Sequence, residues 1–176
     1  MDSFQLLVCL LPVVFMLHDL EEIIFLKTWI TQNKEYIKKR FPRISEKMLP
    51  RLERLSTEGF ALAVAEEFVL LSMVTFVSVF IGSYYLWLSF FMAFATHLVM
   101  HLVQWLVVRR YIPVVVTSLL ALAYCIYTLD VVVEQSIFQV SEIVICTAIG
   151  IVLASFNLVF AHKLGERFDA WVKRNR

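Results

Sequence analysis

"VVFMLHDLEEIIFLK", residues 13–27, is an apolar stretch that holds His18, Asp19, Glu21 and Glu22 within five positions. Of the 176 residues, 60% are hydrophobic and the mean hydropathy is +0.77, whereas an average soluble domain is about 45–50% apolar. The stretch therefore belongs to a membrane-spanning helix, and its polar side chains need compensation from elsewhere in the protein.

Five apolar stretches are long enough to cross a bilayer, which takes about 20 residues of helix. Very short turns join the last four, so we expect these to pack as antiparallel neighbours. The fold class we predict is all-α, a polytopic membrane helix bundle in which residues 1–176 form one membrane domain. The expected spans are residues 4–26, 59–81, 86–108, 111–133 and 137–161.

The basic residues predict how the chain is oriented. All 16 Lys and Arg fall in three places, with nine in 27–54, two at Arg109 and Arg110, and five in 163–176. With five spans these places lie on one side, and an excess of Lys and Arg marks the cytoplasmic side. We expect the N-terminus outside and the C-terminus in the cytoplasm, in the plasma (inner) membrane of a prokaryote. Because the basic residues lie where topology needs them, nothing indicates nucleic-acid binding.

The polar segment 27–58 is the only sizeable piece outside the expected spans. Apolar residues recur in it at helical spacing among basic ones, which predicts a basic amphipathic helix on the inner leaflet. A lid over a cytoplasmic cavity and a partner site are the alternatives. Pro42 and Pro50 are expected to break the segment into short pieces. The apolar positions are Ile44, Met48, Leu52 and Leu55.

Polar residues of the other spans lie at the same depth as those of the first. Counted from the basic or polar end of each span at about 1.5 Å per residue, all of them lie roughly 8–18 Å deep. A carboxylate at the bilayer centre costs about 2.5–3.5 kcal/mol, and no Lys or Arg lies within a span to pair with one. Protonation, a water-filled cavity or bound cations remain as remedies. The residues are Glu66 and Glu67 in the second span, His97 and His101 in the third, and Asn157 in the fifth.

A metal site fits these residues best, because His nitrogen and Glu oxygen ligate zinc, iron or manganese. Spacings of i, i+3 and i, i+4 place ligands on one helical face. We expect one or two divalent ions, with zinc favoured, and a general base among the glutamates, Glu22 or Glu67. Asp19 points about 100° away from His18 and ranks below its neighbours. The predicted ligands are His18, Glu21, Glu22, Glu66, Glu67, His97 and His101.

The run "HDLEE", His18 to Glu22, has the pattern His-x-x-Glu-Glu. Over most of its length the chain resembles the HXXEE-domain family of small integral membrane proteins, whose activity is uncharacterised, so the resemblance implies no reaction. A weaker analogy exists to CAAX-type intramembrane metalloproteases, which use a glutamate pair and later histidines. Here the pair Glu66-Glu67 lacks the following arginine, and Phe94 stands three rather than four residues before His97.

We favour an intramembrane metal-dependent enzyme, a hydrolase that takes a lipophilic substrate from the cytoplasmic leaflet. A dimetal oxidoreductase of the hydroxylase or desaturase type is a variant, although such enzymes usually carry more His motifs. A proton or cation transporter with a buried carboxylate–histidine layer is the competing class, and a purely structural metal is the third. The expected partners are membrane lipid and a lipophilic small molecule, and an oligomer is left open.

Overall fold

In residues 2–175, which the computed structural model describes apart from the side chain of Arg51, the chain forms six helices and no strand. All of them except α2 are long and apolar enough to cross a membrane. The predicted all-α architecture with five potential spans is thereby confirmed, and the chain is built as an integral membrane protein. The helices are α1 (Ser3–Arg40), α2 (Pro42–Arg54), α3 (Thr57–Ile81), α4 (Tyr85–Val108), α5 (Val115–Glu134) and α6 (Val140–Arg174).

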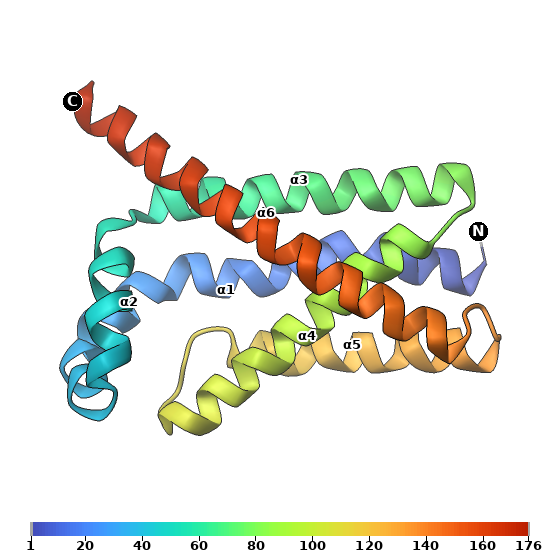
Figure 1. Cartoon of the computed structure of the whole chain (residues 1–176), viewed down its shortest axis with the longest axis horizontal. Coiled ribbons are helices and arrows are strands. Elements are labelled where there is room, and N and C mark those ends of the chain that lie inside the picture. Colours follow the sequence, from blue (N-terminus) through green and yellow to red (C-terminus); the bar gives the residue numbers. More distant parts are fainter. Residues whose placement is uncertain (1, 176) are drawn as a thin grey trace.

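The long helices run between two ends of the molecule, with α1, α3 and α5 along its length and α4 and α6 crossing them obliquely (Figure 1). The two termini lie at opposite ends, and α2 lies at the same end as the C-terminus. The loop from α4 to α5 lies at that end too. The three basic regions of the sequence, near α2, in this loop and at the end of α6, are therefore gathered at one end of the bundle.

The expected spans agree with α3 and α4 to within two residues, whereas the other helices differ in length. Both α1 and α6 continue 13 or more residues beyond the apolar part, to Arg40 and Arg174. In contrast, α5 begins four residues later than expected. Its approach contains Pro113, and both Arg109 and Val114 have positive φ angles, of 55° and 86°, which a helix cannot accommodate.

The prediction that prolines break segment 27–58 into short pieces is wrong in part. The chain does break at Phe41, directly before Pro42, but α2 then runs through Pro50 without interruption. A proline removes one hydrogen-bond donor and frees the carbonyl four residues earlier. Pro50 and Glu46 are both exposed, so water can satisfy the freed carbonyl and the helix continues.

The apolar face predicted for α2 is divided between two environments. Leu52 and Leu55 turn toward α1 and α3, where both line the same cavity. Ile44 and Met48 instead remain 54% and 51% exposed. One half of the apolar face of α2 thus packs on the bundle, and the other half lies exposed on the surface of the molecule.

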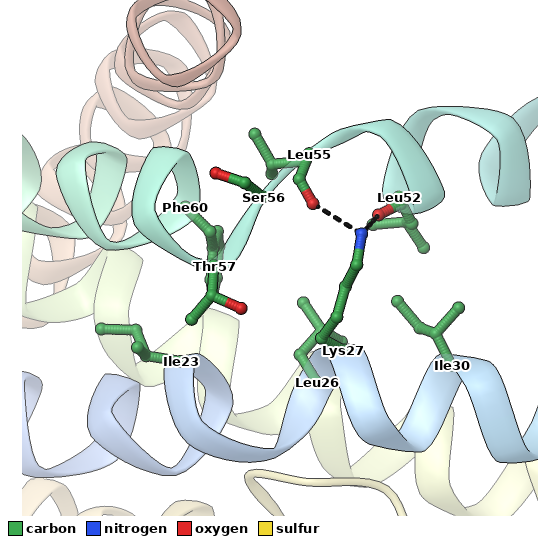
Figure 2. Close-up of a pocket in the computed structure, with 9 residues that line it drawn as sticks. All are labelled: Ile23, Leu26, Lys27, Ile30, Leu52, Leu55, Ser56, Thr57 and Phe60. Atoms are coloured by element: carbon green, nitrogen blue, oxygen red, sulfur yellow. Dashed lines mark hydrogen bonds between the residues drawn. The ribbon is translucent and has the colours of Figure 1, made fainter. Parts of the chain in front are cut away.

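The side chain of Lys27 joins α1 to the C-terminal end of α2 (Figure 2). Its ammonium donates hydrogen bonds to the carbonyls of Leu52 at 3.4 Å, Glu53 at 2.7 Å and Leu55 at 2.8 Å. The last carbonyls of a helix lack partners within it and carry partial negative charge, so a cation stabilises them. Lys27 is therefore committed to holding the turn between α2 and α3.

Two glycines let α6 approach its neighbours closely. A Cβ atom on Gly150 would collide with the backbone carbonyl of Ser89 in α4, and one on Gly165 with the carbonyl of Gly59 in α3. Small residues permit such backbone contact between membrane helices, where van der Waals packing is a main source of association. These contacts fix α6 across α3 and α4.

We expect Lys27→Met to lower stability by about 1–3 kcal/mol, because three carbonyls at the end of α2 lose a charged donor. Thermal unfolding in detergent measures the effect. Lys34→Met is the matched control, since Lys34 lies on the same helix and forms only an exposed salt bridge to Glu53 at 3.7 Å, worth less than about 1 kcal/mol. Equal effects of the two substitutions would contradict the proposed role of Lys27.

Candidate metal centre

Three histidines from two helices meet inside the bundle. The ligand nitrogens of His18 on α1 and of His97 and His101 on α4 all lie within 4.8 Å of one another. The side chain of His18 is only 1% exposed, and its Nε2 atom has no hydrogen-bond partner among the described residues. The predicted meeting of the first and third spans at one depth is thus realised by these three rings.

The other ring nitrogen of His18 is held by a hydrogen-bond chain from α5. Thr117 Oγ1 lies 3.2 Å from His18 Nδ1 and donates its proton to Glu21 Oε2 at 2.6 Å. Because the hydroxyl has one proton to give, its oxygen accepts from His18 Nδ1–H. This network assigns the tautomer of His18 and directs the lone pair of its Nε2 atom toward the other two histidines.

His101 is oriented in the same way by a neighbour on its own helix. Its Nδ1 atom lies 3.3 Å from the amide oxygen of Gln104, which can only accept, so Nδ1 carries the proton. His101 Nε2 is then an acceptor, and His97 Nε2 donates to it at 2.8 Å. Two of the three Nε2 atoms already offer lone pairs, and His97 would join them by carrying its proton on Nδ1.

The cluster suits a divalent metal ion by both its geometry and its chemistry. Tetrahedral zinc with Zn–N distances of about 2.0–2.1 Å places its nitrogen ligands about 3.3 Å apart. The separations here range from 2.8 Å, between His97 and His101, up to 4.8 Å, so small side-chain movements suffice. An ion would also satisfy the buried Nε2 atom of His18, and the hydrogen bonds to the Nδ1 atoms are the outer support that metal-bound histidines usually have.

Three carboxyl groups lie beside the histidines in a cavity of about 420 Å³. Asp19 and Glu22 of α1 and Glu67 of α3 line it together with His97, whose exposed surface opens into it. Among the described residues, no Lys or Arg forms a salt bridge with these carboxyl groups. Asp19 is 4% exposed, and its Oδ2 atom has no hydrogen-bond partner in the described chain. Asp19 is therefore buried, and Glu22 and Glu67 half-buried, without a cationic partner from the described residues.

The remaining predicted ligands, Glu21 and Glu66, point elsewhere. Glu21 accepts hydrogen bonds from the backbone and hydroxyl of Thr117 and from the hydroxyl of Tyr111. Glu66 accepts one from the amide of Asn157 on α6, at 3.2 Å. Glu21 thus supports His18 from outside the cluster, and Glu66 links α3 to α6.

Sequence reasoning ranked Asp19 below its neighbours as a ligand and gave no role to the residues that orient the histidines. Asp19 lies about 100° from His18 around α1, which takes it away from the histidines but into the cavity. Gln104 falls on the same helical face as His97 and His101, as its spacing from them predicts. Thr117 and Tyr111 belong to another part of the chain, and no local pattern connects them to His18.

A family model described as "Protein of unknown function with HXXEE motif" matches residues 9–128 of the chain. The chain belongs to this HXXEE family. The matched segment contains His18, His97 and His101 as well as the carboxyl groups that line the cavity, whereas α6 lies outside it. No curated protein and no solved structure matches the chain significantly.

We expect Thr117→Val to lower stability by about 1–3 kcal/mol, because Glu21 and His18 both lose a hydrogen-bond partner where water is scarce. Thermal unfolding in detergent provides the measurement. Thr75→Val on α3 is the matched control, since Thr75 is 5% exposed and its hydroxyl has no partner among the described residues. That control should be neutral or stabilising, and a similar loss in both variants would rule out the hydrogen-bond chain as the cause.

Proposed function

We propose that this HXXEE protein is an intramembrane metal-dependent hydrolase that acts on a lipophilic substrate. The observation that carries the proposal is the buried, unpartnered Nε2 atom of His18 beside His97 and His101, at the edge of a cavity lined by carboxyl groups. A site that only held the bundle together would need no adjoining cavity, whereas catalysis requires one.

The residues around the cavity have separate roles in this proposal. A divalent ion bound by the histidines would act as a Lewis acid and lower the pKa of water. Glu22 and Glu67 both line the cavity, so either is placed to accept a proton as general base. Phe15, Leu71 and Phe90 belong to the apolar lining and would hold the hydrocarbon part of the substrate.

We propose one ion, with zinc as the first choice and iron or manganese as alternatives. Three neutral imidazoles and one open position are a ligand set that catalytic zinc uses. In the described part of the chain, the three histidines are the group whose ligand atoms lie close enough together to share an ion. Iron in the purified protein would instead favour the oxidoreductase alternative.

The proposal predicts near-stoichiometric divalent metal in detergent-purified protein, measured by inductively coupled plasma mass spectrometry. His18→Ala and His97→Ala should each lose most of it, because each removes one of three ligands. His162→Ala is the matched control, since His162 also lines the cavity but lies on α6 outside the cluster. A folded protein that stays metal-free even after incubation with zinc, iron or manganese would refute the metal centre.

Glu22→Gln and Glu67→Gln separate binding from chemistry in the same preparation. Both should keep the metal, and the one that removes the base should abolish hydrolysis of a panel of long-chain esters and amides. Glu58→Gln, an exposed position on α3, should change neither property. Retained hydrolysis in both cavity variants would exclude these glutamates as the base.

We further propose that the end of the bundle that carries α2 faces the cytoplasm, in a plasma membrane. Arg110 donates a hydrogen bond to the Asn33 amide oxygen at 3.1 Å, and its guanidinium lies 3.8 Å from the centre of the Tyr36 ring. These contacts place the basic pair Arg109-Arg110 beside the basic segment 27–54. The two regions therefore lie on the same side of the membrane, and an excess of Lys and Arg marks the cytoplasmic side. With α2 at this surface, Ile44 and Met48 would enter the leaflet beside its basic residues.

This orientation predicts the behaviour of reporter fusions. Green fluorescent protein joined after the C-terminus should fluoresce, and alkaline phosphatase at the same point should be inactive. Alkaline phosphatase joined at Ser83, in the turn between α3 and α4, should be active, because that turn lies at the opposite end. The reverse pattern would show that the chain is inverted.

A further inference from the structure

We propose that the 420 Å³ cavity binds lipophilic amines, with the nitrogen at the carboxyl groups and an apolar arm on either side. The inference rests on the proposed function only for the claim that such a molecule is a substrate. The binding site itself follows from the shape of the cavity and from the charge of its lining.

The cavity is elongated along the helices, and the lining residues cover nearly the same length on each of the four long helices that form its walls. It is lined from residues 15 to 26 of α1, 60 to 71 of α3, 90 to 100 of α4 and 151 to 162 of α6. Each interval corresponds to about 15–17 Å of helix. A slender molecule can therefore lie parallel to the helices.

The polar groups occupy the middle of that length. The α1 wall begins at Phe15, at the deep end of the cavity far from α2, and ends at Leu26. Asp19 lies four residues from the deep end, and Glu22 lies four residues from the other end. On α3, Glu67 lies four residues from the deep end, which brings it to the same level. Apolar side chains continue on both sides of this level. A ligand that matches the cavity thus has its polar atom near its centre and hydrocarbon on either side.

The charge of the cavity lining determines which charge the polar group of the ligand should carry. Asp19, Glu22 and Glu67 contribute three carboxyl groups, and none of the described lining residues is Lys or Arg. Buried carboxylates require a counter-charge or hydrogen-bond donors, and the unpartnered Oδ2 atom of Asp19 lacks both. An ammonium group supplies charge and donors together, whereas a phosphate or carboxylate would face three carboxyl groups and no Lys or Arg among the described lining residues.

The cation that follows the α1 wall directly in the sequence is not available to alter this selection. Lys27 lies one residue beyond the α1 wall, but its ammonium is held by the carbonyls at the end of α2. On the α6 wall, the Nδ1 atom of His162 is occupied by a hydrogen bond to the carbonyl of Leu158 in its own helix, at 2.8 Å. The cavity therefore keeps its acidic character along its length.

Three probes of one shape test the inference, namely dihexylamine, dihexyl ether and dihexyl phosphate, which place a cationic, neutral or anionic group between identical arms. Native mass spectrometry of the detergent-purified full chain would give the probe concentration at half occupancy. We expect dihexylamine to bind at a concentration at least tenfold lower than either of the others. Dodecylamine, with its nitrogen at one end, should bind more weakly than dihexylamine.

Two variants connect that binding to the cavity. Glu22→Gln combined with Glu67→Gln should remove most of the preference for the amine, whereas Glu58→Gln, an exposed acid on α3, should preserve it. Ala93→Phe places a ring at a buried lining position and should weaken binding of all three probes. Thermal unfolding of each variant confirms that it is folded.

Equal binding of the amine and the ether, tighter binding of the phosphate, or a preference unchanged in the double variant would overturn the inference. So would binding that Ala93→Phe leaves unaffected, because the probe would then lie elsewhere. Metal content measured on the same samples keeps the two proposals separate. A metal-free protein that prefers the amine would refute the metalloenzyme alone, and a metal-containing protein without the preference would refute the amine site alone.

Discussion

The absence of basic side chains from the interior of the described bundle is the constraint on which the rest of this structure depends. Carboxyl groups and imidazoles that are surrounded by apolar helices must obtain hydrogen bonds or counter-charge from some source. Glu21 obtains donors from Thr117 and Tyr111, and Glu66 obtains one from Asn157. Among the ionisable side chains of the described residues, the buried atoms left without a partner are the Nε2 atom of His18 and the Oδ2 atom of Asp19.

Helix α1 is central to this arrangement because it serves two environments at once. His18 and Glu21 face α4 and α5, whereas Asp19 and Glu22 face the cavity that α1 shares with α3. Neighbouring residues of a helix point about 100° apart, so the five-residue run His18–Glu22 divides its side chains between a nitrogen-rich cluster and an acidic cavity. The compactness of the motif is what places these two regions side by side.

The helices and the depth of the polar residues could be predicted from the sequence because both depend on local patterns. Apolar length set α3 and α4 to within two residues, and counting from the basic ends brought His18 to the level of His97 and His101. The rotation of each helix about its axis could not be predicted in this way. It decides that Glu21 meets Thr117 while Asp19 enters the cavity, and it follows from packing between helices that are distant in the sequence. The continuity of α2 through Pro50 was also missed, because it depends on the exposure of one carbonyl.

The close crossing of α6 has a consequence for how such a protein can diversify. The residues proposed to perform chemistry all lie in α1, α3 and α4, within the segment that the HXXEE family model covers, whereas one wall of the cavity comes from α6 outside it. One wall that shapes the cavity is thus encoded separately from the residues proposed to perform the chemistry. Substitutions along residues 151–162 would reshape what the cavity admits without disturbing a single histidine of the cluster, provided that Gly150 keeps the two backbones in contact.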